Sequence, residues 1–173
     1  MDPTYEGGRS RIVFAAAGNR GGNTSLGWPA SMQGVIAIHA TDGLGGATPF
    51  NPTSTPNSFA TLGRDIKSSW WVREGRKPTD KPVYLSGTSF ATPIAAAIAA
   101  NVLEYARWKL MPTSRQNGLL HSPRYMREIF ARMMQPRFGY NYVQPWMLWE
   151  KGWENAAGQA IPVDEVLRDI IRG

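Results

Sequence analysis

The segment from Ser89 to Lys109 constrains the fold of this chain more than any other part of the sequence. It is dense in alanine, which has the highest intrinsic helix propensity and is small enough to let a helix lie close to a sheet. Pro93 falls near the expected first turn, where a missing backbone N–H costs little. Because the short apolar run Val83 to Leu85 leads into it through Ser86-Gly87, the sequence predicts a strand, a tight turn and a long helix packed on a sheet.

Two further apolar runs predict buried strands of a parallel sheet. The first covers residues Ile12 to Ala17 and ends at Gly18-Asn19, and the second covers Val35 to Ile38 before a turn-rich stretch. Continuous apolar runs bounded by turn residues are typical of strands that are buried on both faces. Short strands are also expected at Phe59 to Leu62 and Ile66 to Trp71, with loops over residues 48–58 and 73–81.

Helices are expected in the C-terminal part of the chain. Ser122 and Pro123 are residue types that favour the N-cap and the first position of a helix, and apolar residues recur at helical spacing after them. A last helix is expected over residues 163–171, where apolar residues recur in the same way. We interpret the aromatic stretch between these helices, Tyr140 to Trp153, as packing rather than as an interaction surface.

Composition excludes several classes of protein and of site. The chain has 173 residues, 42% of them hydrophobic, which is enough for one folded domain with a core. It has no cysteine, so it can form neither a disulfide nor a thiolate metal site, and its two histidines leave little material for a metal centre. We therefore expect no metal and no cofactor.

Membrane and secretory signals are not visible in the sequence. The longest mostly apolar stretch, Phe90 to Leu103, has 14 residues, which is too short to span a bilayer. The N-terminal residues do not combine a basic region with a long apolar stretch, as a signal peptide would. We expect no membrane partner, and an intracellular location is favoured.

The net charge of +6 is concentrated in one part of the chain. Residues 105–140 hold seven lysines and arginines and one glutamate, so this segment carries the whole excess of positive charge. A basic stretch can bind nucleic acid. A solvated helical face is the interpretation we favour, and no nucleic-acid partner is expected.

The strongest chemical signal is the motif Gly87-Thr88-Ser89-Phe90-Ala91-Thr92-Pro93. A serine nucleophile needs an exposed hydroxyl and a close approach of substrate to the backbone, and a glycine followed by a serine at a helix N-terminus provides both. The helix start also offers backbone N–H groups and the positive end of its dipole to a developing oxyanion. The motif resembles the nucleophile signature of subtilases, Gly-Thr-Ser-x-Ala-(Thr/Ser)-Pro. The rival elbow of α/β-hydrolases, Gly-x-Ser-x-Gly, requires glycine where Ala91 stands.

Two more motifs carry the same resemblance. Residues 15–19 read Ala-Ala-Ala-Gly-Asn, and a subtilase strand that ends in this way supplies an amide donor to the oxyanion. The segment Gly27-Trp28-Pro29-Ala30, which precedes the second apolar run, resembles the subtilase segment that lines the floor of the pocket for the residue before the scissile bond. Ser89 alone could be a helix cap and Asn19 alone a turn residue, but three motifs in the family order argue against both.

The resemblance covers roughly residues 11–110 and implies a fold and a set of site residues. The implied fold is α/β, with a partial subtilisin-like parallel sheet, flanking helices and a helical C-terminal extension. We expect residues 1–110 to form the C-terminal half of a subtilisin-like peptidase domain. Residues 111–173 are expected to pack on it as an extension similar to that of fungal intracellular subtilases. Ser89 is the expected nucleophile and Asn19 the expected oxyanion-hole donor, and the residues expected to border the specificity pocket are Gly18, Arg20, Gly27, Trp28 and Pro29.

The resemblance also implies two catalytic residues that this sequence lacks. In subtilases the catalytic Asp lies in an Asp-(Ser/Thr)-Gly turn and the catalytic His in a His-Gly-Thr helix start, and both precede the serine. Neither motif is present. Asp42 follows Asn19 in the chain, and His39 and His121 stand where the family has no catalytic residue. After Pro93 the family usually has His-Val-Ala-Gly, whereas this chain has Ile-Ala-Ala-Ala, a departure that concerns packing under the nucleophile.

The function implied by the resemblance is serine-type endopeptidase activity on peptide or protein substrates. Without the Asp and the His, the chain alone is expected to be inactive, and a missing N-terminal half is the partner that would supply them. The alternative is a non-catalytic peptidase remnant that acts as a binding module. If both missing motifs were found in frame upstream of Met1, the endopeptidase would be favoured over the binding module.

Overall fold

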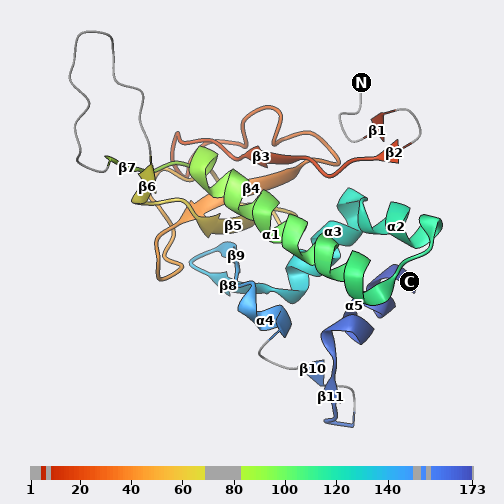
Figure 1. The fold of residues 1–173 in the computed structure, drawn as a ribbon. Helices are drawn as coiled ribbons and strands as arrows, with labels where there is room; N and C mark the ends of the chain where they lie inside the picture. The colour runs from red at the N-terminus through yellow and green to blue at the C-terminus, as the bar shows by residue number, and fades with distance from the viewer. Residues whose placement is uncertain (1–4, 7–8, 69–82, 150–152, 155–156, 173) are drawn as a thin grey trace.

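A five-stranded sheet with strands in the order β3-β4-β5-β9-β8 forms the centre of the fold (Figure 1). The computed structural model describes residues 5–6, 9–68, 83–149, 153–154 and 157–172. The strands of this sheet are β3 (Phe14–Ala16), β4 (Ile36–Thr41), β5 (Phe59–Leu62), β8 (Met134–Arg137) and β9 (Tyr140–Val143). Strands β3, β4, β5 and β9 run parallel to one another, and the edge strand β8 is antiparallel to β9. The predicted α/β fold with a mostly parallel sheet is confirmed.

The other elements surround this sheet. Short antiparallel pairs are formed by β1 (Tyr5–Glu6) with β2 (Arg9–Ser10), β6 (Ile66–Ser68) with β7 (Val83–Leu85), and β10 (Trp153–Glu154) with β11 (Ala160–Ile161). The helices are α1 (Thr88–Leu110), α2 (Ser114–Leu120), α3 (Pro123–Arg132), α4 (Trp146–Trp149) and α5 (Val163–Arg172). Within the described ranges, no helix combines the length and the apolar character that a membrane span requires.

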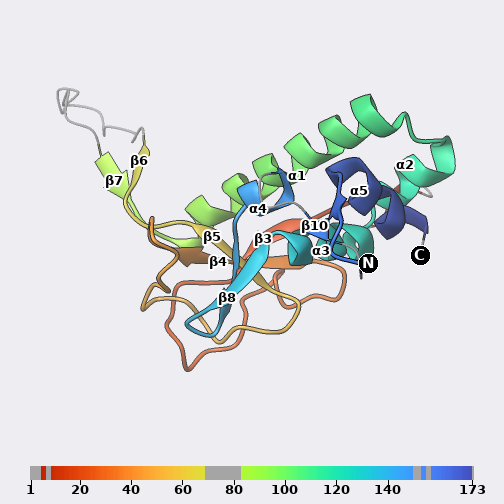
Figure 2. The ribbon, with the colours of Figure 1, turned by 90° about the horizontal axis from the view of Figure 1, so that it is seen from below.

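Helix α1 lies against one face of the sheet, and the loops that follow β3 and β4 lie on the other side (Figure 2). Successive side chains of a strand point to opposite faces. Accordingly, Ile36, Ile38 and Ala40 of β4 belong to the core cluster that includes α1, whereas Ala37 belongs to a separate cluster. The helix packs closely because its buried face consists mostly of alanine: Ala91, Ala95, Ala99 and Ala106, with Val102 among them.

Gly63, directly after β5, sets the distance between the sheet and the start of α1. A Cβ atom at this position would lie 2.7 Å from the Cβ of Ala40 and 3.0 Å from the carbonyl oxygen of Gly87. The N–H of Gly87 donates to the carbonyl of Gly63 at 2.8 Å, and the hydroxyl of Thr61 donates to the carbonyl of Ala91 at 2.8 Å. Because only glycine permits this approach, the N-terminus of α1 is held at the carboxyl end of β5.

Two details of this region differ from the sequence expectation. Pro93 is the sixth residue of α1 and therefore lies in the second turn, where it removes the N–H that would bond to the carbonyl of Ser89. Strand β6 covers Ile66–Ser68, and residues 69–71 of the strand expected there lie outside the described residues, as does the loop expected over residues 73–81.

The helices predicted near Ser122 and over residues 163–171 are confirmed as α3 and α5. The Ser122 hydroxyl accepts a hydrogen bond from the N–H of Tyr125 at 3.4 Å, and Pro123 is the first residue of α3. Helix α2 is not predicted by the sequence, because its seven residues show no apolar periodicity. A capping box between Thr113 and Gln116 fixes its start.

Strand β9 lies at the start of the aromatic stretch Tyr140 to Trp153, for which packing is expected, and β8 directly precedes this stretch. Tyr142 and Val143 of β9 are buried, and Tyr142 is paired with Ala60 of β5. Because β9 extends the central sheet, residues 111–173 contribute strands as well as helices. The domain boundary expected at residue 110 stays a prediction.

Candidate active site

Ser89 is the second residue of α1 and its side chain is exposed. The first N–H groups of a helix have no intrahelical partner, and the positive end of the helix dipole lies among them. The residue before the helix is Gly87, and a Cβ atom there would lie 3.3 Å from the Nδ2 atom of Asn19. Ser89 is thus an accessible hydroxyl at a site that favours negative charge.

The side-chain amide of Asn19, which follows β3, is held in one orientation by Thr88. The Oδ1 atom of Asn19 accepts hydrogen bonds from the N–H of Thr88 at 2.9 Å and from its hydroxyl at 3.1 Å. A backbone N–H can only donate, so the amide atom that faces Thr88 must be the oxygen. The NH₂ group of Asn19 therefore points away from Thr88 and, among the described residues, has no acceptor, so it can donate beside Gly87, two residues before Ser89.

Thr88, within the motif Gly87 to Pro93, orients the Asn19 amide, a contact that the motif alone does not indicate. Its side chain is fully buried, and its hydroxyl also accepts a hydrogen bond from the N–H of Gly18 at 3.2 Å. Thr88 thus ties the end of β3 to the start of α1. The sequence indicates this role only through the threonine that precedes Ser89, because its partners Gly18 and Asn19 lie about 70 residues away along the chain.

The residues expected to border a specificity pocket, Gly18, Arg20, Gly27, Trp28 and Pro29, follow β3. The N–H of Gly27 donates to the carbonyl of Ala17 at 2.8 Å, and a Cβ atom at Gly18 would lie 3.9 Å from the nitrogen of Gly27. The bond between Trp28 and Pro29 is a cis peptide. The Trp28 side chain is 81% exposed and Arg20 is also exposed. Gly18 and Gly27 are therefore adjacent, whereas the indole of Trp28 is open to solvent.

Neither histidine of the sequence lies at Ser89. His39 lies two residues after Ala37 on β4, so both side chains lie on the same face of the sheet, opposite α1. Its ring packs against Tyr140, with the ring centroids 4.9 Å apart. The Asp42 side chain is engaged in its own turn, where its Oδ1 atom accepts from the N–H groups of Leu44 and Gly46.

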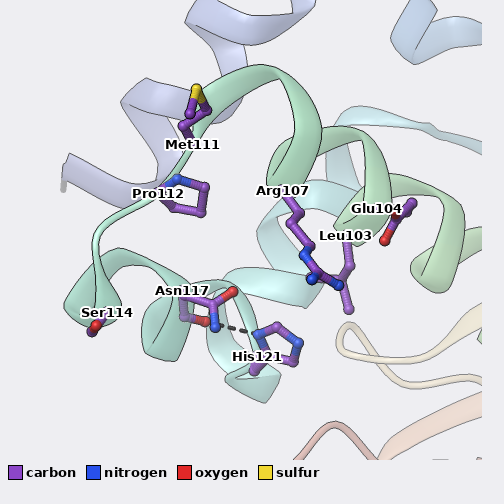
Figure 3. Close-up of a pocket in the computed structure, with 8 residues that line it drawn as sticks. All are labelled: Leu103, Glu104, Arg107, Met111, Pro112, Ser114, Asn117 and His121. Atoms are coloured by element: carbon purple, nitrogen blue, oxygen red, sulfur yellow. Dashed lines mark hydrogen bonds between the residues drawn. The ribbon is translucent and has the colours of Figure 1, made fainter.

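His121, at the end of α2, lies beside the other end of α1. Its Nδ1 atom is 2.8 Å from the carbonyl oxygen of Asn117, and the two residues line a pocket of about 650 Å³ together with Leu103 and Arg107 of α1 (Figure 3). Leu103 is separated from Ser89 by about 21 Å along the helix axis, at a rise of 1.5 Å per residue. This pocket is remote from the nucleophile.

The described residues contain no group of three or more His, Cys, Asp or Glu side chains that could hold a metal ion. The arrangement at Ser89 can instead stabilise an anion with fixed donors. These are the amide of Asn19 and the N–H of Ser89, because the N–H groups of Thr88, Phe90 and Ala91 already have acceptors.

A protein-family model and several known proteins match this sequence. The model of the subtilase family matches residues 2–141. The chain is 33% identical over 103 residues to thermitase of Thermoactinomyces vulgaris, which covers 60% of this chain and 34% of thermitase. It is 31% identical over 106 residues to subtilisin DY of Bacillus licheniformis, covering 60% and 35% of the two chains. This chain thus spans about a third of the length of these relatives.

Solved structures of peptidases superimpose on this chain. The patellamide maturation protease PatA superimposes with a TM-score of 0.54 at 26% identity, covering 90% of this chain and 50% of that protein. The prenylagaramide maturation protease PagA shares the fold, with a TM-score of 0.55 at 24% identity over 93% of this chain and 50% of that protein. With a family model that matches most of its length, this chain belongs to the subtilase family of serine peptidases.

Proposed function

We propose that this chain is the C-terminal half of a subtilisin-like endopeptidase domain and carries its nucleophile and its oxyanion hole. The observation that supports this most is the amide of Asn19, whose oxygen is held by Thr88 so that its NH₂ group can donate beside Ser89. In the proposed reaction the Ser89 hydroxyl attacks the scissile carbonyl of a peptide substrate. The Asn19 amide and the N–H of Ser89 stabilise the negative charge that develops on the carbonyl oxygen.

The general base and its aspartate come, in this proposal, from a partner segment. The sequence has two histidines, one beneath the opposite face of the sheet and one at the far end of α1, so neither can take the proton of Ser89. The partner is an N-terminal half with the Asp-(Ser/Thr)-Gly and His-Gly-Thr motifs. Its histidine would accept the proton and its aspartate would orient the ring. Residues 111–173 are then an extension similar to that of fungal intracellular subtilases.

Labelling with a fluorophosphonate, which reacts with activated serines, tests this proposal. The isolated chain is expected to remain unlabelled, because a serine without a base has an ordinary hydroxyl. The chain fused behind a subtilase segment that carries both motifs, called the joined enzyme below, is expected to be labelled at Ser89. Stoichiometric labelling of the isolated chain would reveal a base within it. A joined enzyme that folds but is not labelled would support the non-catalytic binding module instead.

Arg20 is proposed to bias the substrate preference of the joined enzyme. It follows Asn19 directly and is exposed, and a guanidinium is always charged. We expect an acidic residue before the scissile bond to be favoured over lysine by a few-fold in kcat/KM, because an exposed ion pair contributes only about 0–1 kcal/mol. Trp28, whose indole is exposed, offers an apolar surface that keeps large apolar residues acceptable at that position.

A peptide library cleaved by the joined enzyme and by its Arg20→Glu variant measures this effect. The Glu-to-Lys preference ratio should invert in the variant, and the difference should shrink at high salt. An unchanged ratio would remove Arg20 from substrate selection.

A further inference from the structure

His39 is a fully buried imidazole for which the described residues provide no hydrogen bond at either ring nitrogen. The hydroxyl of Thr41, two residues further along β4 and therefore on the same face, is also buried and without a partner among the described residues. Buried polar groups without hydrogen bonds are costly, and a charge at such a position is far more costly. This pair is thus a weak point in the packing beneath the sheet.

The loop after β4 packs beside His39. Residues 48–53 of this loop are called the bracing loop below. The Asn51 side chain is buried and bonds both backbone groups of Ala40, at 2.9 and 2.8 Å. Tyr140, whose ring packs on His39, donates its hydroxyl to the carbonyl of Pro52 at 3.0 Å. The bracing loop is therefore attached to the strand and to the aromatic ring on either side of the imidazole.

The same loop braces the turn that carries Asn19. The N–H of Gly21 donates to the carbonyl of Phe50 at 2.9 Å, and the N–H of Thr53 donates to the carbonyl of Thr24 at 3.0 Å. The hydroxyl of Thr53 also donates to the carbonyl of Gly22, at 2.6 Å. A continuous set of contacts thus links the buried imidazole, through the bracing loop, to residues 21–24, which directly follow Asn19 and Arg20.

Protonation of His39 would place a charge in this buried position. Burial lowers the pKa of His39 from its usual 6.5 to about 4. The titratable and charged groups on the elements around it do not compensate for such a charge. Tyr140, on β9, has its pKa raised by burial and stays neutral. Asp42 is bonded to backbone N–H groups of its own turn, and Arg137, on β8, bonds the carbonyl of Leu44.

We propose that His39 is an acid-sensitive latch, whose protonation opens the bracing loop and releases the turn that carries Asn19. The structural step stands by itself, and its effect on peptide hydrolysis rests on the function proposed above. In the open state the imidazole reaches water and regains an ordinary pKa. Because the pKa of the closed state is the lower one, the closed state is fully favoured above pH 6.5. It loses stability as the pH falls from there, and the loss levels off below about pH 4.

Hydrogen exchange of the isolated chain, followed amide by amide by NMR, tests the latch. The amides of Gly21 and Thr53 report the bracing loop, and those of Ala99 and Val102 in α1 report global unfolding. Between pH 7 and pH 4, the protection factors of Gly21 and Thr53, corrected for intrinsic exchange, are expected to fall by about 10²-fold. This factor follows from the two pKa values of the open and closed states. Protection in α1 should fall by a similar factor, because global unfolding also exposes His39, but it should stay well above the protection of Gly21 and Thr53 at every pH.

Variants assign the effect to one side chain. His39→Phe keeps a ring against Tyr140 without a titratable nitrogen, and His39→Gln serves if that variant does not fold. Both should abolish the fall in protection. His121→Gln, which removes the exposed histidine, and Asp42→Asn, which keeps an acceptor in its turn, should behave like the parent chain.

Two results would overturn the latch. One is an undiminished fall in protection of Gly21 and Thr53 in the His39 variants. The other is a protection factor of Gly21 and Thr53 that equals that of Ala99 and Val102, because the loop would then open only by global unfolding. Neither result bears on the labelling of Ser89 in the joined enzyme, so failure of the latch and failure of the proposed peptidase are distinguishable.

Discussion

Alanine in place of Ser89 is expected to abolish peptide hydrolysis by the joined enzyme. The hydroxyl is the atom that forms the covalent bond to substrate, so its removal leaves only the binding and oxyanion contributions. We expect kcat to fall by about 10⁶-fold, the loss known for the nucleophile of subtilisin, a member of this same family. Hydrolysis of a chromogenic peptide measures this loss.

Ser86→Ala is the matched control for this substitution. Ser86 is also exposed and lies three residues earlier, and its hydroxyl accepts a hydrogen bond from the N–H of Asp65 at 2.9 Å. The control should retain kcat close to the parent value. A Ser89→Ala enzyme that turns over substrate at a comparable rate would show that another residue is the nucleophile.

Asn19→Ala in the joined enzyme is expected to lower kcat by about 10²–10³-fold and to leave KM nearly unchanged. The magnitude is that known for the oxyanion-hole asparagine of subtilisin, again in the same family. KM should not change because the amide bonds mainly to the transition state, in which the carbonyl oxygen carries negative charge. Full kinetic curves for a peptide substrate separate the two constants.

Two further variants show whether the orientation of Asn19 matters. Thr88→Val removes the hydroxyl that donates to Asn19 Oδ1 but keeps the N–H that also donates to it. We expect Thr88→Val to lower kcat by less than Asn19→Ala does, and Thr88→Ser to retain a kcat close to that of the parent enzyme. Asn23→Ala, at an exposed position in the next turn, is the control. A rise in KM with constant kcat in Asn19→Ala would place the amide in ground-state binding.

The parts of the fold that the sequence predicts are those with local signals. The alanine-rich run predicts α1, and the Ser122-Pro123 pair predicts the start of α3, because helix propensity and capping act within one or two turns. The apolar run over residues 12–17 predicts β3. The second apolar run ends at Ile38, yet β4 continues to Thr41. The hydrophobic pattern places the strand end too early because His39 and Thr41 are polar residues that are nevertheless buried.

Other features depend on contacts between distant residues. The hydrogen bond from Thr88 to Asn19 spans 69 positions, so no local pattern indicates that this threonine orients the amide. The pairing of β5 with β9 joins Ala60 to Tyr142. The sequence also does not predict the β8–β9 hairpin. Its turn places Phe138 at a φ of 50° and Gly139 at a φ of 81°. Phenylalanine is rarely found at positive φ, so the sequence lacks an ordinary turn signal there.

The proposed function requires that the start of α1 and the Asn19 amide stabilise negative charge beside residue 89. The chain has no cysteine, so Ser89→Cys introduces a single thiol whose pKa can be measured from the pH dependence of its alkylation by iodoacetamide. No partner segment is needed. The same measurement on Ser25→Cys, at an exposed position away from α1, gives the reference.

We predict that the thiol of Ser89→Cys has a pKa below the ordinary value of about 8.5, because the helix N-terminus and the amide favour the thiolate. Adding Asn19→Ala should raise that pKa, because it removes an amide dipole beside Gly87, two residues before position 89. A thiol that titrates near 8.5, with or without Asn19, would contradict the account.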